Sequence, residues 1–352
     1  MTVSQNLEFK NILVKAAQES VADLHLSTGC QIKAKVDNKL VDWPEQVVTG
    51  GFLEKNILDL LSGEQKKEFS EKKFFVLVHQ FADDLRFRIT LFRQENKLSA
   101  ILRFIPHKVR TVEELYLPKM LEKVIVAERG LVIVSGIGKT TTIAAIVEYI
   151  NKTSNKTIIT LEDPVEYIFV NQKSLIEQRQ IGIDTPSFAQ GVKDLLNIDV
   201  GVAVVDGKDY AKYINEILEL SEKCLVILDL SSHNIKDAIN DFISFIPAEE
   251  KQEKRQLLAN NLIAILNQIL VARQGGGLLP VVEILLNNSA VATAIAEDRI
   301  SRIPDLIVMS GHEGMISLER SLAELVKSGE VLIDEAVKYV DDKNEFREMI
   351  LK

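Results

Sequence analysis

The sequence predicts an α/β protein in two parts, a small α+β domain over residues 1–105 and a mostly parallel α/β domain over residues 119–352. The first part alternates short helices with strands rich in Val, Ile and Phe, as an antiparallel sheet would. From residue 130 onward, continuous apolar runs alternate with helices, as in a parallel sheet. The charged stretch 106–118, with a proline at each end, is the predicted linker.

The first part contains two predicted helices, one over residues 7–20 and one over residues 52–61 that Gly63 would end as a C-cap. Residues 33–40 alternate loosely, and the run 42–44 (DWP) interrupts them. Three further segments have the composition of strands: 74–80, 85–92 and 99–104.

The second part begins with a predicted buried strand at 131–134 and a helix at 141–150. Further buried strands are expected at 157–161, 202–205 and 225–230. From Asp237 onward the sequence predicts a mainly helical region with a loop at 275–277.

Composition excludes several classes of protein. With 46% apolar residues the chain is not disordered, and no apolar run approaches the ~18–20 residues that span a bilayer. Residues 1–9 contain Glu8 and no apolar core, which argues against a signal peptide. The two cysteines cannot form a disulfide scaffold, so we expect a reducing cytoplasm. The net charge, 42 − 51 = −9, argues against nucleic acid as the main partner.

Residues 132–141 (VIVSGIGKTT) have the arrangement of a phosphate-binding loop: a strand, a glycine turn, Lys-Thr and a helix. In such a loop, backbone N–H groups and the helix N-terminus hold phosphates, the lysine reaches the outer phosphates and the next hydroxyl ligates Mg²⁺. Lys139 and Thr140 are the residues for these two roles. The candidate nucleotide-binding residues are Gly136, Gly138, Lys139, Thr140 and Thr141.

This loop is shorter than the motif requires. The motif has four residues between its glycines, whereas only Ile137 separates Gly136 from Gly138, so 4 − 1 = 3 residues are missing. An ordinary strand-to-helix turn is the alternative interpretation.

Other segments resemble landmarks of the secretion and pilus motor ATPases, in the same order along the chain. These are ADLHLS at 22–27, LRFR at 85–88, LRFIP at 102–106, the acidic TLEDPVEY at 160–167, FIPAEEK at 245–251 and GGG at 275–277. The resemblance covers nearly the whole chain and is closest to the PilT-like type IV pilus retraction ATPases. It implies a PAS-like N-terminal domain and a RecA-like P-loop ATPase domain that binds ATP and Mg²⁺.

The same resemblance implies a ring, either a homo-hexamer or a hetero-oligomer with an intact paralogue. It would act on an inner-membrane pilus platform protein, at the cytoplasmic face of the bacterial inner membrane.

Three carboxylates are candidate catalytic groups. Glu162 and Glu166 flank Asp163-Pro164 at the end of a buried strand, where a carboxylate orients water or binds Mg²⁺. A solvated or helix-capping acidic turn is the alternative. Asp206 could hold Mg²⁺ through a water.

Arg86, Arg88 and Arg103 lie on predicted strands, and the resemblance suggests that they reach a neighbouring subunit's γ-phosphate. Ordinary surface arginines are the alternative. No acidic partner in their own chain is obvious from the sequence, which motivates the ring.

The chain departs from the family pattern at several positions. The Walker B strand ends in Asp206-Gly207 without a glutamate, and Ser231 aligns with the family's histidine, with His233 two residues on. The retraction-associated AIRNLIRE appears as AVATAIAE at 290–297, where Ala292 and Ala296 replace both arginines.

These features predict a PilT-like motor ATPase with weak ATP binding and weakened turnover. The alternative is a pseudo-ATPase, a ring subunit or regulator that keeps the fold and interfaces without hydrolysis. A sequencing or assembly error that removed part of the loop would explain the three missing residues, but it would not explain the changes at Asp206, Ser231, Ala292 and Ala296.

Overall fold

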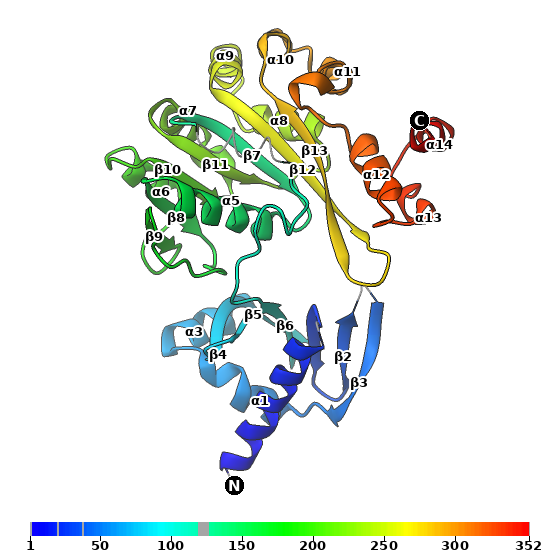
Figure 1. Cartoon of the computed structure of the whole chain (residues 1–352). Coiled ribbons are helices and arrows are strands. Elements are labelled where there is room, and N and C mark those ends of the chain that lie inside the picture. The colour runs from blue at the N-terminus through cyan, green and yellow to red at the C-terminus, as the bar shows by residue number, and fades with distance from the viewer. Residues whose placement is uncertain (1, 20, 37–38, 119–126, 352) are drawn as a thin grey trace. The chain divides into compact units, whose positions relative to one another are not determined.

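The structure is a computed structural model that describes residues 2–19, 21–36, 39–118 and 127–351 (Figure 1). It divides into two compact units. The N-terminal unit comprises Met1–Lys108 with Pro164–Ile168, and the C-terminal unit comprises Val109–Asp163 with Phe169–Lys352.

The N-terminal unit is built on an antiparallel sheet of six strands in the order β3-β2-β1-β6-β5-β4. The strands are β1 (Asp23–Ser27), β2 (Gln31–Val36), β3 (Lys39–Val47), β4 (Phe74–Ala82), β5 (Leu85–Gln94) and β6 (Lys97–Ile105). The helices are α1 (Thr2–Gln18), α2 (Gly50–Asn56), a 3₁₀ turn (Leu58–Leu60) and α3 (Gly63–Lys72). Apolar side chains of α1, among them Leu13, share one core with the sheet.

Two predictions for this unit are wrong. Gly63 does not end a helix but starts α3, because Ser62 and Gln65 form a capping box that favours a helix start there. The run at 42–44 does not interrupt the chain's extended course, because β3 continues through it; β3 is an edge strand, where a proline is tolerated. The three predicted strands are confirmed as β4, β5 and β6.

The C-terminal unit contains a sheet of seven strands in the order β13-β12-β7-β11-β10-β8-β9. All neighbours are parallel except β12 and β13. The strands are β7 (Gly130–Gly136), β8 (Thr157–Glu162), β9 (Leu175–Gln180), β10 (Val202–Asp206), β11 (Leu225–Leu230), β12 (Leu262–Ala272) and β13 (Leu278–Leu286).

Helices pack on both faces of this sheet (Figure 1). Alternate residues of the central strands point to opposite faces, so Val132 packs with α5 while Ile133 packs with α6, α7 and α8. The helices are α5 (Lys139–Thr153), α6 (Phe188–Leu195), α7 (Ile214–Lys223), α8 (Ile235–Ser244), α9 (Lys251–Asn261), α10 (Ser289–Ala296), α11 (Ile303–Met309), α12 (Leu318–Lys327), α13 (Ile333–Ala336) and α14 (Lys343–Leu351), with 3₁₀ turns at Tyr210–Lys212, Ile300–Arg302 and Gly311–Glu313.

The region after Asp237 is less helical than predicted. Strands β12 and β13 form a long antiparallel hairpin that adds two strands to the sheet. Both strands are largely buried, so they lack the alternation that identifies a half-exposed strand. The predicted loop at 275–277 is confirmed as the turn of this hairpin.

The predicted linker 106–118 is divided between the two units, and its buried residues Val112, Leu115 and Leu117 join a core of the C-terminal unit. The predicted start of the second domain at residue 119 lies outside the described residues, so these boundaries stay a prediction. Among the described residues, no helix is long and apolar enough to cross a membrane.

Candidate functional site

The predicted phosphate loop and the acidic strand ends meet at the carboxyl edge of the C-terminal sheet. Strands β8, β10, β11 and β7 are parallel neighbours, so they all end at this edge. The register pairs Glu162 with Asp206, and Asp229 with Val134 shortly before the loop. In parallel α/β sheets this is the edge at which ligands bind.

The shortened loop carries β7 directly into α5. Gly136 and Gly138 both adopt positive φ, +94° and +82°, which glycine tolerates best. The N–H of Ile137 donates to the carbonyl of Gln268 on β12 (2.8 Å), and the Gln268 side chain donates back to the Ile137 carbonyl (2.9 Å). A Cβ at Gly136 would lie 1.9 Å from that Gln268 carbonyl. The loop is thus held against β12, and the Ile137 N–H does not face a ligand.

Lys139 begins α5 and is held by the chain itself. Its ammonium group forms an ion pair with Asp229 and donates to the Ser231 hydroxyl at 2.9 Å. The side chains of Lys139 and Asp229 are 18% and 4% exposed. A cation at a helix N-terminus opposes the helix dipole, so the Asp229 carboxylate supplies a counter-charge there.

Asp206 forms a carboxyl pair with Asp229 on the neighbouring strand. Burial, followed by the nearby Asp229 and Glu162, raises the pKa of Asp206 to about 8. Burial also raises the pKa of Asp229, although Lys139 opposes this. Burial and the repulsion between the two carboxylates therefore favour retention of a proton by the pair.

Glu162 is buried at the end of β8, 8% exposed. Its Oε1 accepts hydrogen bonds from the Thr160 hydroxyl (2.6 Å) and the Gln178 side-chain amide (3.0 Å), which fix the carboxylate in orientation. The next residue, Asp163, is exposed and pairs with Lys208 at 3.2 Å.

The remaining predicted positions of this unit are also placed. Thr140 and Thr141 lie half-buried in the first turn of α5. Strand β11 ends at Leu230, so His233 does not continue the strand and is exposed, while Ser231 contacts Lys139. Ala292 and Ala296 lie on α10, partly buried against the core.

The N-terminal unit contains the three arginines, and each has a partner within the chain. Arg86 donates to the carbonyls of Glu166 (2.8 Å) and Val165 (2.9 Å), and Arg88 donates to the Glu166 carboxylate at 2.7 Å. Glu166 therefore belongs to the N-terminal unit together with these arginines, whereas Asp206 belongs to the C-terminal unit.

Arg103 contacts both oxygens of the Asp23 carboxylate, at 2.7 and 3.1 Å. No acidic partner is obvious from the sequence, but the structure supplies one for Arg88 and one for Arg103. The antiparallel pairing of β1 with β6 sets Asp23 directly opposite Arg103.

Sequence reasoning missed Asp229 and Gln268, which hold Lys139 and the loop. Gln268 is buried and also accepts from the Thr142 hydroxyl at 2.6 Å. Asp229 is the one polar residue of β11 (LVILDL), and Gln268 follows Asn267 in the otherwise apolar β12 (LIAILNQILVA). A buried polar group needs a partner, so this pattern was the available signal.

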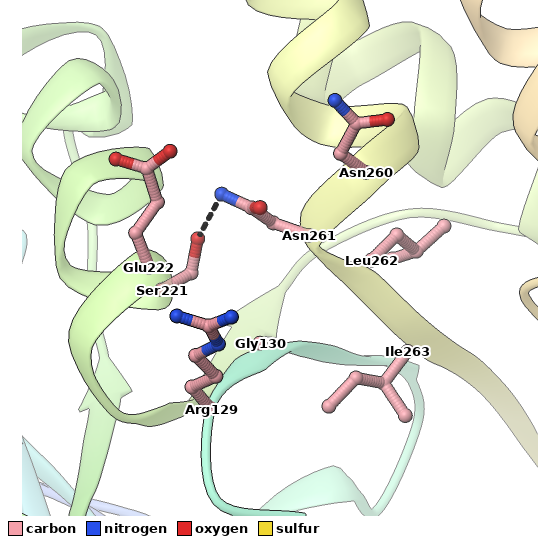
Figure 2. Close-up of a pocket in the computed structure, with 8 residues that line it drawn as sticks. All are labelled: Arg129, Gly130, Ser221, Glu222, Asn260, Asn261, Leu262 and Ile263. Atoms are coloured by element: carbon pink, nitrogen blue, oxygen red, sulfur yellow. Dashed lines mark hydrogen bonds between the residues drawn. The ribbon is translucent and has the colours of Figure 1, made fainter.

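A pocket of about 350 Å³ lies at the opposite edge of the same sheet (Figure 2). It is lined by Arg129 and Gly130 at the start of β7, by Asn261 and Leu262 at the start of β12, and by Ser221 on α7. Asn261 donates to the Ser221 hydroxyl at 3.1 Å, as the dashed line shows. This pocket is at the amino edge and contains none of the predicted nucleotide residues.

The residues at the carboxyl edge are suited to hold a terminal phosphate, but they form only part of the cradle that a whole nucleotide needs. Gly138 gives α5 no side-chain cap, and the first N–H groups of a helix have no partner within it. Lys139 and the Thr140 hydroxyl belong to the same turn. The Ile137 N–H, however, already donates to the Gln268 carbonyl, so fewer backbone donors remain for the inner phosphates.

Comparison with known proteins places the chain in a family. The family described as "Type II/IV secretion system protein" matches residues 9–205. The chain is 30% identical over 349 residues to the type IV pilus ATPase PilU of Pseudomonas aeruginosa, covering 98% of this chain and 91% of PilU. It is 30% identical over 327 residues to the retraction ATPase PilT of the same species, covering 92% and 95%.

Solved structures agree with the predicted fold. The crystal structure of the pilus retraction motor PilT with bound ADP matches with a TM-score of 0.82 at 26% identity, over 96% of this chain and 98% of that one. The ATPase DotB of Legionella pneumophila matches in fold, with a TM-score of 0.80 at 18% identity over 94% of each chain. The PAS-like and RecA-like fold classes are therefore confirmed, and the chain belongs to the type II/IV secretion system protein family, alongside PilT and PilU.

Proposed function

We propose that the chain is a PilT-like motor ATPase that couples ATP binding and hydrolysis to retraction of a type IV pilus, with weakened activity. The observation that supports this most directly is the meeting of Lys139, Glu162 and Asp206 at one carboxyl edge, in a chain similar to PilT over nearly its full length. ATP, when bound, supplies the free energy of hydrolysis.

In this proposal the residues divide the work by their position. Lys139 and the first N–H groups of α5, from Gly138 to Thr140, hold the terminal phosphate. The Thr140 hydroxyl and the Asp206 carboxylate would hold Mg²⁺, which would require Asp206 to release its proton. Glu162, fixed by Thr160 and Gln178, orients the attacking water.

The contacts of the three arginines remove one reason for expecting a ring, because that reason was the lack of an obvious acidic partner in their own chain. Arg86, Arg88 and Arg103 would have to leave own-chain partners before they could reach a neighbour's phosphate. A hexamer, or a mixed ring with an intact paralogue, is therefore proposed from the relatives alone. On the same ground we propose action on an inner-membrane platform protein, from the cytoplasmic side.

A second candidate function is a pseudo-ATPase subunit or regulator of the same machinery. It is favoured by the ion pair of Lys139 with Asp229 and by the commitment of the Ile137 N–H to Gln268. Both contacts occupy groups that a phosphate needs.

The ATPase rate of the purified chain distinguishes the two functions. A motor gives turnover that Lys139→Ala abolishes and that Lys152→Ala, in the last turn of the same helix, leaves unchanged. A rate equal to that of Lys139→Ala at saturating ATP would overturn the motor proposal and leave the regulator. Sedimentation with and without nucleotide tests the ring, and a monomer under both conditions at micromolar concentration would contradict it.

A further inference from the structure

A groove of about 620 Å³ lies in the C-terminal third of the chain, and none of the residues grouped around Lys139 lines it. Helices α11, α12 and α14 form its walls, and they lie on the same side of β13 (orange to red in Figure 1). Its size is within the range of sites that accept a ligand or several partner side chains.

The floor of this groove is apolar. Met315, Ala323 and Phe346 line it and are only 1–2% exposed. Met349 adds a flexible thioether side chain that adapts to different partners. On the wall formed by α11, Val308 is 69% exposed, so an apolar surface large enough to anchor a side chain faces the solvent.

The rim is strongly acidic. Seven of the lining side chains are acidic and two are basic. One of the basic residues, Arg320, already contacts Glu324 at 3.4 Å. Besides Glu283, the acidic residues are Asp305 on α11, Glu319 and Glu324 on α12, and Asp341, Asp342 and Glu345 at the start of α14.

Glu283 lies deepest among these carboxyl groups. It accepts a hydrogen bond from the backbone N–H of Ile235 at 3.3 Å. Burial, with a smaller contribution from Glu319, raises its pKa to about 7. Among the described residues, no basic side chain forms an ion pair with it. A cation from outside the chain would relieve both the buried carboxyl group and the acidic rim.

We propose that this groove binds a basic amphipathic helix of a partner protein. Apolar side chains of that helix pack on Val308 and Met349, two of the more exposed apolar side chains of the groove, and its lysines or arginines pair with the acidic rim. Acidic side chains around an apolar surface between helices are complementary in charge and polarity to a basic amphipathic helix. The proposal does not depend on nucleotide chemistry, and it stands whether or not the chain hydrolyses ATP.

Fluorescence anisotropy of the full chain with a labelled synthetic helix tests the proposal. The probe has leucine at positions i, i+3, i+4 and i+7 and lysine elsewhere. Two control peptides replace its lysines by glutamate or its leucines by serine. The leucine–lysine peptide should bind, more weakly at high salt, and both controls should bind at least about tenfold more weakly.

Matched variants locate the binding site. Glu345→Lys and Val308→Ser change groove residues, whereas Glu348→Lys and Met309→Ser change exposed residues of the same two helices outside the groove. Each groove variant should weaken binding about tenfold or more relative to its control variant, at unchanged melting temperature. Equal binding by all four variants would overturn the proposal.

Self-association provides a second test. If the groove variants, but not their controls, lower the oligomeric state in sedimentation, the occupant is a second copy of the chain and the proposal is wrong. Equal binding of the leucine–glutamate peptide would likewise contradict it.

Discussion

Asp229→Asn should make the chain less stable without ligand and better at binding a nucleotide. Asp229 holds the ammonium group of Lys139 in an ion pair, and the side chain of Asp229 is only 4% exposed. A phosphate at the N-terminus of α5 must compete with this carboxylate for the same lysine. Asparagine keeps the size of the side chain and an acceptor oxygen but removes the competing charge.

The magnitudes of the two effects follow from the burial of the pair. Removing one partner of a buried ion pair costs about 3–5 kcal/mol. We expect the lower value, because Lys139 keeps its contact with Ser231 and is 18% exposed. For a unit of this size a loss of about 3 kcal/mol lowers the melting temperature by about 6–12 °C. One charge-assisted hydrogen bond returned to the phosphate contributes about 1.5–3 kcal/mol, a gain of about 10- to 150-fold in affinity.

Thermal unfolding without ligand and titration with a fluorescent ADP analogue measure the two effects. The matched control is Asp163→Asn at the same edge, which removes an exposed pair with Lys208 and should change both quantities little. If Asp229→Asn binds the analogue no more tightly than the unaltered chain, the carboxylate does not hold Lys139 back. The predicted weak nucleotide binding would then come from the shortened loop alone.

Three further outcomes are expected. Inserting three residues between Gly136 and Gly138 should raise the affinity for Mg·ATP by about 10²-fold or more, but it should raise the ATPase rate less, because Asp206 remains in place of a glutamate. Equal gains in affinity and in rate would contradict this prediction. Gly136→Ala should lower the melting temperature far more than Gly182→Ala, because both positions have positive φ (+94° and +81°) but only the first places a Cβ 1.9 Å from a backbone oxygen. Similar losses of melting temperature would contradict this and would show that the β12 backbone moves aside to accept the new methyl group. The pKa of Asp206 is raised to about 8 in the folded chain, so its contribution to stability is fully present below the unfolded pKa near 3.8 and is lost as pH rises toward 8. In urea unfolding, the free energy of unfolding of Asp206→Asn should therefore fall less between pH 5 and 8 than that of the unaltered chain. An equal fall in both would assign the pH dependence to other groups.

Much of the fold could be predicted from local pattern. A few neighbouring residues are enough to identify a strand by its composition and apolar pattern. This holds for the buried strands β7, β8, β10 and β11 and for β4, β5 and β6. The hairpin of β12 and β13 could not be recognised in the same way, because strands buried on both faces have no alternation. The start of α3 was readable, since Ser62 and Gln65 have the spacing of a capping box.

The sequence by itself determined which residues form the candidate phosphate loop, and the length of that loop. Only the tertiary structure decided what these residues contact. Lys139 and Asp229 are 90 positions apart, and they meet because β11 pairs with β7 in the sheet. Arg103 and Asp23, 80 positions apart, meet because β6 pairs with β1. Helical and strand periodicity are properties of neighbouring residues, whereas ion pairs between strands depend on strand order and register, which the whole chain sets.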